Sequence, residues 1–436
     1  MMTPELIGLG GLAILIVLIL IRVPIGVSLI TVSFFGTWLL VGERVAWGML
    51  GIIPYSLAAD WSMASVPMFI LMGYIAYHGR LTSGLFTAAR VWLNNIPGGL
   101  AVSAIFGATG FAAVTGSSVA CSAAMGRIAI PEMERAGYDM RLATGALAAA
   151  GTIGALIPPS ILLIIYGVIV NISITDLFIG GIVPGLLTGV GYIAIIIVLA
   201  ILKPELAPRI TEKIDWMTRI RHLKEVLPTL AIVLFVFGGL FAGVFTPGQA
   251  GAVGAAFALV LCVLRRSISR REIWRAFCET LEVSASLFII VIGANLLTRF
   301  LAFSGAGDLL SGVISDAVTN QYLLLLLITL IYLLLGMFLD PLGAMLLTLP
   351  IFLPVLGAAD VNLLWFGVFL VKLLEIGMIT PPIGLNVFVM KSVVGNKVSV
   401  SQIFRGVVPF ILSDLAIVAL MIFVPATVLL LPALLN

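Results

Sequence analysis

The stretch that decides the fold is GTIGALIPPS, residues 151–160, which recurs as EIGMITPPIG at residues 375–384. Before it stands TGSSVACSAAMGRIAIP at residues 115–131, matched by LDPLGAMLLTLPIFLP at residues 339–354. Pro and Gly coincide at an offset of 223 residues, later 225, in seven pairs: Pro24/Pro247, Pro131/Pro354, Gly154/Gly377, Pro158/Pro381, Pro159/Pro382, Gly181/Gly406 and Pro184/Pro409. We therefore predict an internal duplication with one Gly/Pro-broken apolar segment per copy. Paired breaks of this kind mark the central binding site of secondary transporters.

The composition is that of a membrane protein. Hydrophobic residues make up 61% of the chain and charged residues 10%, against about 25% charged in soluble domains. Six apolar runs are long enough to span or nearly span a bilayer: 6–21, 25–41, 182–202, 226–244, 250–264 and 322–339. The net charge of +3 does not indicate nucleic-acid binding, because the basic residues lie in short loops. Three cysteines without paired spacing indicate neither a disulfide framework nor a zinc site.

Loop charges predict that the two copies lie upside down relative to each other. The loop after the second span of copy one holds only Arg44, whereas its counterpart holds five arginines, Arg265, Arg266, Arg270, Arg271 and Arg275. A later loop reverses the bias: copy one has Arg127, Arg135 and Arg141, and residues 350–364 of copy two have no Lys or Arg. Because Lys and Arg favour the cytoplasmic side, matched loops lie on opposite sides of the membrane.

We divide the chain into membrane repeat 1 (1–202), a cytoplasmic linker (203–224) and membrane repeat 2 (225–436). Each repeat is predicted to hold about five spanning helices, one re-entrant hairpin and one Pro-broken helix. The hairpins are placed at 95–132 and 320–358, because under 40 residues is short for two crossings. The broken helices are placed at 142–170 and 363–390. By this count both termini are periplasmic.

The breaks and the hairpin tips are the predicted ion sites. Proline lacks an N–H and interrupts the helix, and the freed carbonyls, with hydroxyls, suit a hard cation such as Na⁺. The first candidate site joins Thr115, Ser117 and Ser118 to Gly154, Ile157 and Pro158. The second joins Asp340 to Gly377, Thr380 and Pro381. The alternative interpretation is a pair of structural proline kinks.

Four polar residues are candidates for substrate contact: Thr115, Ser160, Glu375 and Asn386. Half-helix N-termini after the breaks would favour a carboxylate. Ser160 and Asn386 equally fit a role in satisfying the broken backbone. Glu375 lies three residues from Lys372, so the two share a helix face and are expected to neutralise each other. Asp340 has no such partner in sequence, which favours a ligand or ion-coupling role.

The strings GATGFAAVTGSSVACSAAMG, GALIPPSILLIIYG and MITPPIGLNVFV resemble the large, DctM-like membrane subunit of TRAP (tripartite ATP-independent periplasmic) transporters. The resemblance covers essentially the whole chain. It implies an elevator-type secondary importer of the ion-transporter superfamily, coupled to Na⁺, in the bacterial inner membrane. It also implies a small four-helix membrane subunit (DctQ-like) and a periplasmic substrate-binding protein (DctP-like). Substrates of the family are mostly small organic acids: dicarboxylates, sugar acids and oxo acids.

Three other functions were considered. A self-sufficient ion-coupled organic-anion carrier of the same superfamily would need no binding protein. A channel of similar inverted design is the second alternative, against which saturable uptake that depends on a binding protein would favour a carrier. An intramembrane aspartyl protease would use Tyr-Asp and Gly-x-Gly-Asp motifs, and Asp139 and Asp308 stand in such strings. The loop charges place these two carboxylates on opposite sides of the membrane. No catalytic residue is therefore predicted, and the chain is not expected to be an enzyme.

Overall fold

The computed structural model describes residues 3–209, 214–309, 312 and 320–435, and every regular element in them is a helix. The first half contains α1 Pro4–Leu20, α2 Ile25–Val41, α3 Glu43–Ala58, η1 Trp61–Ala64, α4 Ser65–His78, α5 Ser83–Leu93, α6 Gly99–Thr115, α7 Ser118–Arg135, α8 Met140–Thr152, η2 Ile153–Ala155, α9 Ile161–Val170 and α10 Ile174–Leu202. The second half contains α11 Trp216–Leu223, α12 Leu227–Phe241, α13 Pro247–Leu264, α14 Arg270–Ser304, α16 Gln321–Gly336, α17 Pro341–Ala358, α18 Leu363–Gly377, α19 Leu385–Val394, η3 Gly395–Lys397, α20 Val400–Phe423 and α21 Ala426–Leu435.

Length and hydropathy confirm a polytopic all-α membrane protein. Five described helices are long and apolar enough to cross a membrane: α10, α13, α14, α17 and α20. The pairs α3–α4 and α11–α12 pass the same test as spans bent by 57° and 42°, which raises the number to as many as seven. Shorter apolar helices, α1 and α2 among them, occupy the other predicted crossings.

Helix boundaries recur along the chain at the spacing seen in the sequence. α7 and α17 each have 18 residues and begin at Ser118 and Pro341. α8 and α18 begin at Met140 and Leu363, again 223 positions apart. In each half a hairpin, a broken helix and a long helix follow in the same order. The inverted orientation of the halves and their exact limits stay predictions.

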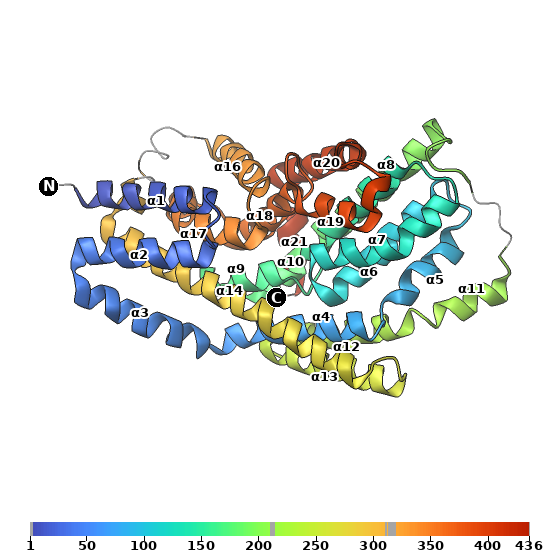
Figure 1. Cartoon of the computed structure of the whole chain (residues 1–436), viewed down its shortest axis with the longest axis horizontal. Coiled ribbons are helices and arrows are strands. Elements are labelled where there is room, and N and C mark those ends of the chain that lie inside the picture. The colour runs from blue at the N-terminus through green and yellow to red at the C-terminus, as the bar shows by residue number, and fades with distance from the viewer. Residues whose placement is uncertain (1–2, 210–213, 310–311, 313–319, 436) are drawn as a thin grey trace.

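Packing interlocks the two halves. α14 packs along α2 and α4, and α13 packs along α4, so the early helices of both halves form one block with α1 and α12. Figure 1 shows α14 running obliquely across the molecule beside α2 and α4. On the other side α8 packs on α20, and α10 packs on α18 and α20. A shared apolar core of α6, α7, α8, α10, α19 and α20 joins the hairpin of the first half to the end of the second.

The predicted linker, 203–224, contains a short helix that the sequence analysis did not predict. α11 begins after Asp215, whose side chain accepts a hydrogen bond from the Met217 N–H. It packs against α5, where the Trp92 indole donates to the Arg219 carbonyl at 3.3 Å. Its apolar residues lie on a different face from its basic ones, a pattern typical of a membrane-surface helix.

Candidate functional site

Each hairpin tip is a helix start capped by a polar residue. In the first hairpin Gly116 turns the chain at φ +60°, and the Ser117 side chain accepts a hydrogen bond from the Ala120 N–H. In the second hairpin the Asp340 carboxylate accepts from the Gly343 N–H at 3.0 Å. Both side chains satisfy N–H groups that a helix start leaves without a partner. Asp340 therefore has a local structural role in addition to any role in ion binding.

The first break lies directly against the first tip. A Cβ built on Gly116 would lie 2.2 Å from the Pro159 carbonyl oxygen, so only glycine fits there. A Cβ on Gly154 would lie 3.5 Å from the Ser118 backbone nitrogen. The break between α8 and α9 and the tip between α6 and α7 thus share one backbone interface. This is the juxtaposition expected for the first ion site.

The second break lies against the end of α16. A Cβ on Gly377 would lie 2.6 Å from the Gly336 Cα, so the backbones touch. The Thr380 hydroxyl donates to the Ile376 carbonyl at 2.7 Å, within its own helix end. Pro381 is exposed, whereas Pro158 in the first break is buried. Both Pro-Pro peptide bonds, 158–159 and 381–382, are cis.

The two tips meet at one cavity of about 180 Å³. Its polar lining comes from both halves: Ser117 and Ser118 from the first hairpin, Asp340 from the second, and Glu375 from the end of α18. The Ser118 hydroxyl donates to the Glu375 carboxylate at 2.5 Å. Both residues are buried, with Glu375 1% exposed. Three residues predicted for two separate ion sites, and one predicted for substrate contact, therefore line a common space.

Other predicted residues lie nearby without lining this cavity. Thr115 lines an adjoining cavity of about 370 Å³ with Ser117, Tyr74 and Tyr77, and its hydroxyl donates to its own helix at 3.1 Å. Ile157 packs against Gly185 of α10. The Ser160 hydroxyl caps α9 by accepting from the Leu163 N–H at 3.2 Å. Two roles were open for Ser160, substrate contact and satisfying the broken backbone, and this hydrogen bond corresponds to the second.

Asn386 faces the opposite half of the chain. Its Nδ2 donates to the Ala148 carbonyl at 3.3 Å, while its buried Oδ1 has no partner among the described residues. A Cβ on Gly151 would lie 3.0 Å from Asn386 Nδ2 and 2.7 Å from the Ser118 carbonyl oxygen. A buried acceptor without a donor costs free energy, so this oxygen is suited to a cation or a ligand donor beside the first tip.

The predicted neutralisation of Glu375 by Lys372 is wrong. The Lys372 ammonium lies 2.6 Å from Asp414 of α20 and also donates to the Thr188 hydroxyl at 2.8 Å. The Tyr192 hydroxyl donates to the other Asp414 oxygen at 2.7 Å. Two residues on one helix face need not pair when a neighbouring helix presents a better-placed carboxylate. Glu375 thereby remains free to bond the hairpin tip.

Sequence reasoning missed Asp414, although a signal was present. It is the one acidic residue in the 24-residue apolar helix α20. An isolated carboxylate in such a helix needs a partner, and the buried Lys372 was the available cation. The lining of the cavity by Val283 and Leu287 of α14 had no comparable signal. It depends on how the second half packs across the first.

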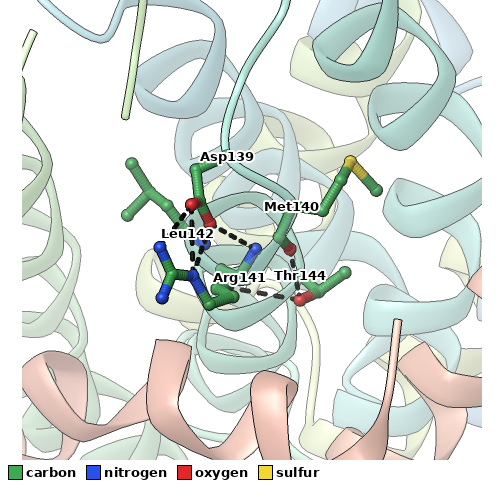
Figure 2. Close-up of polar contacts among 5 residues, drawn as sticks. All are labelled: Asp139, Met140, Arg141, Leu142 and Thr144. Atoms are coloured by element: carbon green, nitrogen blue, oxygen red, sulfur yellow. Dashed lines mark hydrogen bonds and ion pairs between the residues drawn. The ribbon is translucent and has the colours of Figure 1, made fainter. Parts of the chain in front are cut away.

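Asp139 takes part in an ion pair at the start of α8 and is not a protease-like residue. Its carboxylate accepts two hydrogen bonds from Arg141 Nε at 3.1 Å each and one from Nη2 at 2.7 Å (Figure 2). It also accepts from the Arg141 backbone N–H at 2.7 Å. The hydrogen bonds from the Arg141 side chain hold the pKa of Asp139 below its usual value. Within the described residues no group of three His, Cys, Asp or Glu is placed to hold a metal ion.

The sequence profile of the family described as the tripartite ATP-independent periplasmic transporter, DctM component, matches residues 12–427. The chain belongs to this family. It is 31% identical to the C4-dicarboxylate TRAP transporter large permease protein DctM of Pseudomonas aeruginosa over 88% of the chain and 89% of that protein. Its identity to the sialic acid permease SiaM of Vibrio cholerae is 31%, and to the ectoine/5-hydroxyectoine permease UehC of Ruegeria pomeroyi 32%, both over 94% of the chain and 95% of the relative.

A solved structure shares the fold at low sequence identity. The YdaH transporter of Alcanivorax borkumensis superposes with a TM-score of 0.60 at 15% identity, covering 87% of this chain and 89% of that one. The named relatives are transporter permeases and not enzymes, in agreement with the absence of any predicted catalytic residue. This DctM chain is thus a multi-pass membrane transport protein of the TRAP type.

Proposed function

We propose that this DctM chain is the large membrane subunit of a Na⁺-coupled secondary importer of a small organic acid. The substrate class is a dicarboxylate, sugar acid or oxo acid, delivered by a periplasmic DctP-like binding protein. A small four-helix DctQ-like subunit completes the complex in the bacterial inner membrane. The observation that carries the proposal is the cavity between the two hairpin tips, where Ser117, Ser118, Asp340 and Glu375 converge.

The chemistry of this cavity supports ion-dependent binding. Two hydroxyls and two carboxylates are oxygen donors, the ligand type that hard cations prefer. The two carboxylates, when ionised, repel an organic anion unless a cation neutralises them. A Na⁺ ion at the tips, held also by carbonyls of the breaks near Gly154 and Gly377, would allow the cavity to bind a carboxylate. Sodium binding and substrate binding then reinforce each other, as linkage requires.

Movement is proposed as an elevator. The hairpins, α8–α10 and α18–α20 would move as one unit against a scaffold of α1–α4 and α12–α14. The shared core that joins α6–α8 to α19 and α20 supports such a rigid mobile unit. The scaffold block, held together by α14 against α2 and α4, is then the surface that receives the small subunit.

The first test needs no substrate: thermal unfolding of the purified protein in NaCl and in choline chloride at equal ionic strength. A cation that binds only the folded state stabilises by about 2.7 kcal/mol at a hundredfold excess over its Kd. We expect a sodium-specific rise in melting temperature that Thr380→Ala reduces. Thr427→Ala is the matched control, because the Thr427 hydroxyl also donates to a nearby carbonyl, that of Val424, at 2.8 Å but on an exposed surface.

Transport is then measured in proteoliposomes with the small subunit and the binding protein, using labelled succinate, sialic acid and pyruvate. Uptake should require an inward Na⁺ gradient and the loaded binding protein. Uptake that stays the same when Na⁺ is replaced by K⁺ would contradict the proposed coupling to sodium. Uptake that needs no binding protein would instead identify the self-sufficient carrier.

A further inference from the structure

A second polar cavity, which shares no lining residue with the cavity between the hairpin tips, lies where α8 begins, α10 ends and α20 makes its second turn. Its volume is about 210 Å³, and its charged lining is Asp139, Arg141, Lys203 and Arg405. Backbone contacts hold these segments together. The Asp139 N–H donates to the Leu206 carbonyl at 3.0 Å, and a Cβ on Gly406 would lie 1.9 Å from the Arg141 carbonyl oxygen. The cavity is therefore bounded by tightly packed backbone.

The cavity has an excess of positive charge. Arg141 and Asp139 neutralise each other through the multiple hydrogen bonds drawn in Figure 2. Lys203 and Arg405 have no ion pair within the part of the chain that the structure describes. Two cationic side chains thus converge on one space, and no described carboxylate pairs with either of them. An anion with several oxygen acceptors, such as a phosphate, matches this arrangement.

Apolar surface continues from the cavity along both flanking long helices. Leu199 and Pro409 line the cavity itself. Beside the lining residues, Leu202 at the end of α10 is 71% exposed, and Val198 one turn earlier is 51% exposed. Leu412, three residues beyond Pro409 on α20, is 62% exposed. In a membrane protein such outward side chains face lipid tails. A charged pocket that opens onto lipid-facing helices fits a phosphate that carries acyl chains, because a free phosphate would gain nothing from the apolar flanks.

We propose that this cavity binds the headgroup phosphate of an anionic phospholipid, with Lys203 and Arg405 as its cationic contacts. The acyl chains would lie along α10 and α20. Loop charge places Arg141, Lys203 and Arg405 on one side, the predicted cytoplasmic one, where basic pockets between helices bind anionic lipid. Because Lys203 caps the last helix of the first half and Arg405 belongs to the second half, the bound lipid bridges the two halves at the start of the linker.

The test uses the full chain, purified and delipidated in a neutral detergent. Native mass spectrometry counts bound lipid after addition of phosphatidylglycerol or phosphatidylcholine, and thermal unfolding is followed with each lipid and with inorganic phosphate. We expect phosphatidylglycerol alone to bind specifically and raise the melting temperature. In Lys203→Gln/Arg405→Gln its apparent affinity should fall roughly thirtyfold, from the loss of two surface cations.

Arg270→Gln/Arg271→Gln is the matched control, because it removes two basic residues from the start of α14 on the same predicted side. It should retain phosphatidylglycerol binding. Equal binding by the Lys203/Arg405 variant, or equal effects of phosphatidylcholine, would overturn the proposal. Stabilisation by inorganic phosphate as strong as by the lipid would also overturn it in favour of a free anion. Lys203 and Arg405 are exposed, so their variants should fold, and each single variant provides the same comparison.

Discussion

The Ser118 hydroxyl links the first hairpin tip to the broken helix of the other half by donating a hydrogen bond to Glu375. Its donor is a hydroxyl that the repeat pattern singled out, and its acceptor is a buried carboxylate. Such a bond matters more than an exposed one, because the carboxylate has little water to replace a lost donor.

Removing this donor should destabilise the protein measurably. Ser118→Ala leaves Glu375 short of a partner, at a cost of about 1–3 kcal/mol in unfolding free energy. Ser103→Ala is the control, since the buried Ser103 hydroxyl donates only to Gly99 of its own helix at 2.6 Å. Combined with Glu375→Gln, the substitution should show a coupling of about 0.5–3 kcal/mol in equilibrium unfolding. Strictly additive effects would contradict the contact.

Gly116 should tolerate no side chain. Gly116→Ala places a Cβ at φ +60°, which costs about 1–2 kcal/mol, and forces the Pro159 carbonyl away from the tip. We expect a lower melting temperature and a weaker response to NaCl. Gly48→Ala serves as comparison, because nothing lies within 4 Å of a Cβ there and alanine favours a helix by up to about 1 kcal/mol. If Gly116→Ala left the melting temperature and its rise with NaCl unchanged, the tip could not be tightly packed.

At the scale of elements, the chain Thr152–Tyr192–Asp414–Lys372–Thr188 joins helices α8, α10, α18 and α20 through buried hydrogen bonds. These are the helices that surround both breaks. The network therefore ties the two broken helices together, and none of its five residues is among those that line the cavity between the tips.

Removing the cation of this network should strongly lower the free energy of unfolding. Lys372→Met leaves Asp414 buried without its cation and should cost about 3–5 kcal/mol, whereas Lys372→Met/Asp414→Leu should recover most of the loss. The exposed pair of Lys397 and Glu134, at 2.7 Å, provides the control, since Lys397→Met should cost no more than about 1 kcal/mol. Folded yield and melting temperature measure all three. A double variant as unstable as Lys372→Met would count against an ion pair.

Sequence and structure agree best where local rules govern. The tip at Thr115–Ser118 was predictable because glycine and a capping serine interrupt an apolar run, and α6 ends and α7 begins there. The partner of Lys372 was not predictable from helix spacing, because the nearest carboxylate along the helix competes with one brought by α20. Ser160 and Thr380 were recognisable as polar residues at breaks, but only the fold decides that they bond their own backbone.

At the scale of the whole molecule, the elevator proposal puts the boundary between scaffold and mobile unit between α4 and the first hairpin tip. A Cβ on Gly73 of α4 would lie 3.1 Å from the Thr115 Cα. Relative movement of the two units would have to separate these positions.

A disulfide across this boundary should stop transport. In a background without Cys121, Cys262 and Cys278, Gly73→Cys/Thr115→Cys places two Cβ atoms near the 3.5–4.5 Å that a disulfide requires. Oxidation should abolish uptake in proteoliposomes, and reduction should restore it to the level of the reduced double variant. Each single variant controls for the substitution itself. Undiminished uptake by the fully cross-linked protein would contradict the elevator movement at this boundary.

The sequence by itself determined that the chain lies in a membrane and is helical. It also determined the two hairpins with their polar tips and the two proline breaks. These features follow from local chemistry: apolar length, helix capping and the missing N–H of proline. Only the tertiary structure decided that Ser118 meets Glu375, that Lys372 pairs with Asp414, and that Lys203 and Arg405 share a pocket. Each pair joins residues of different helices or segments far apart in the sequence, and no local spacing rule governs which faces of two distant helices come into contact.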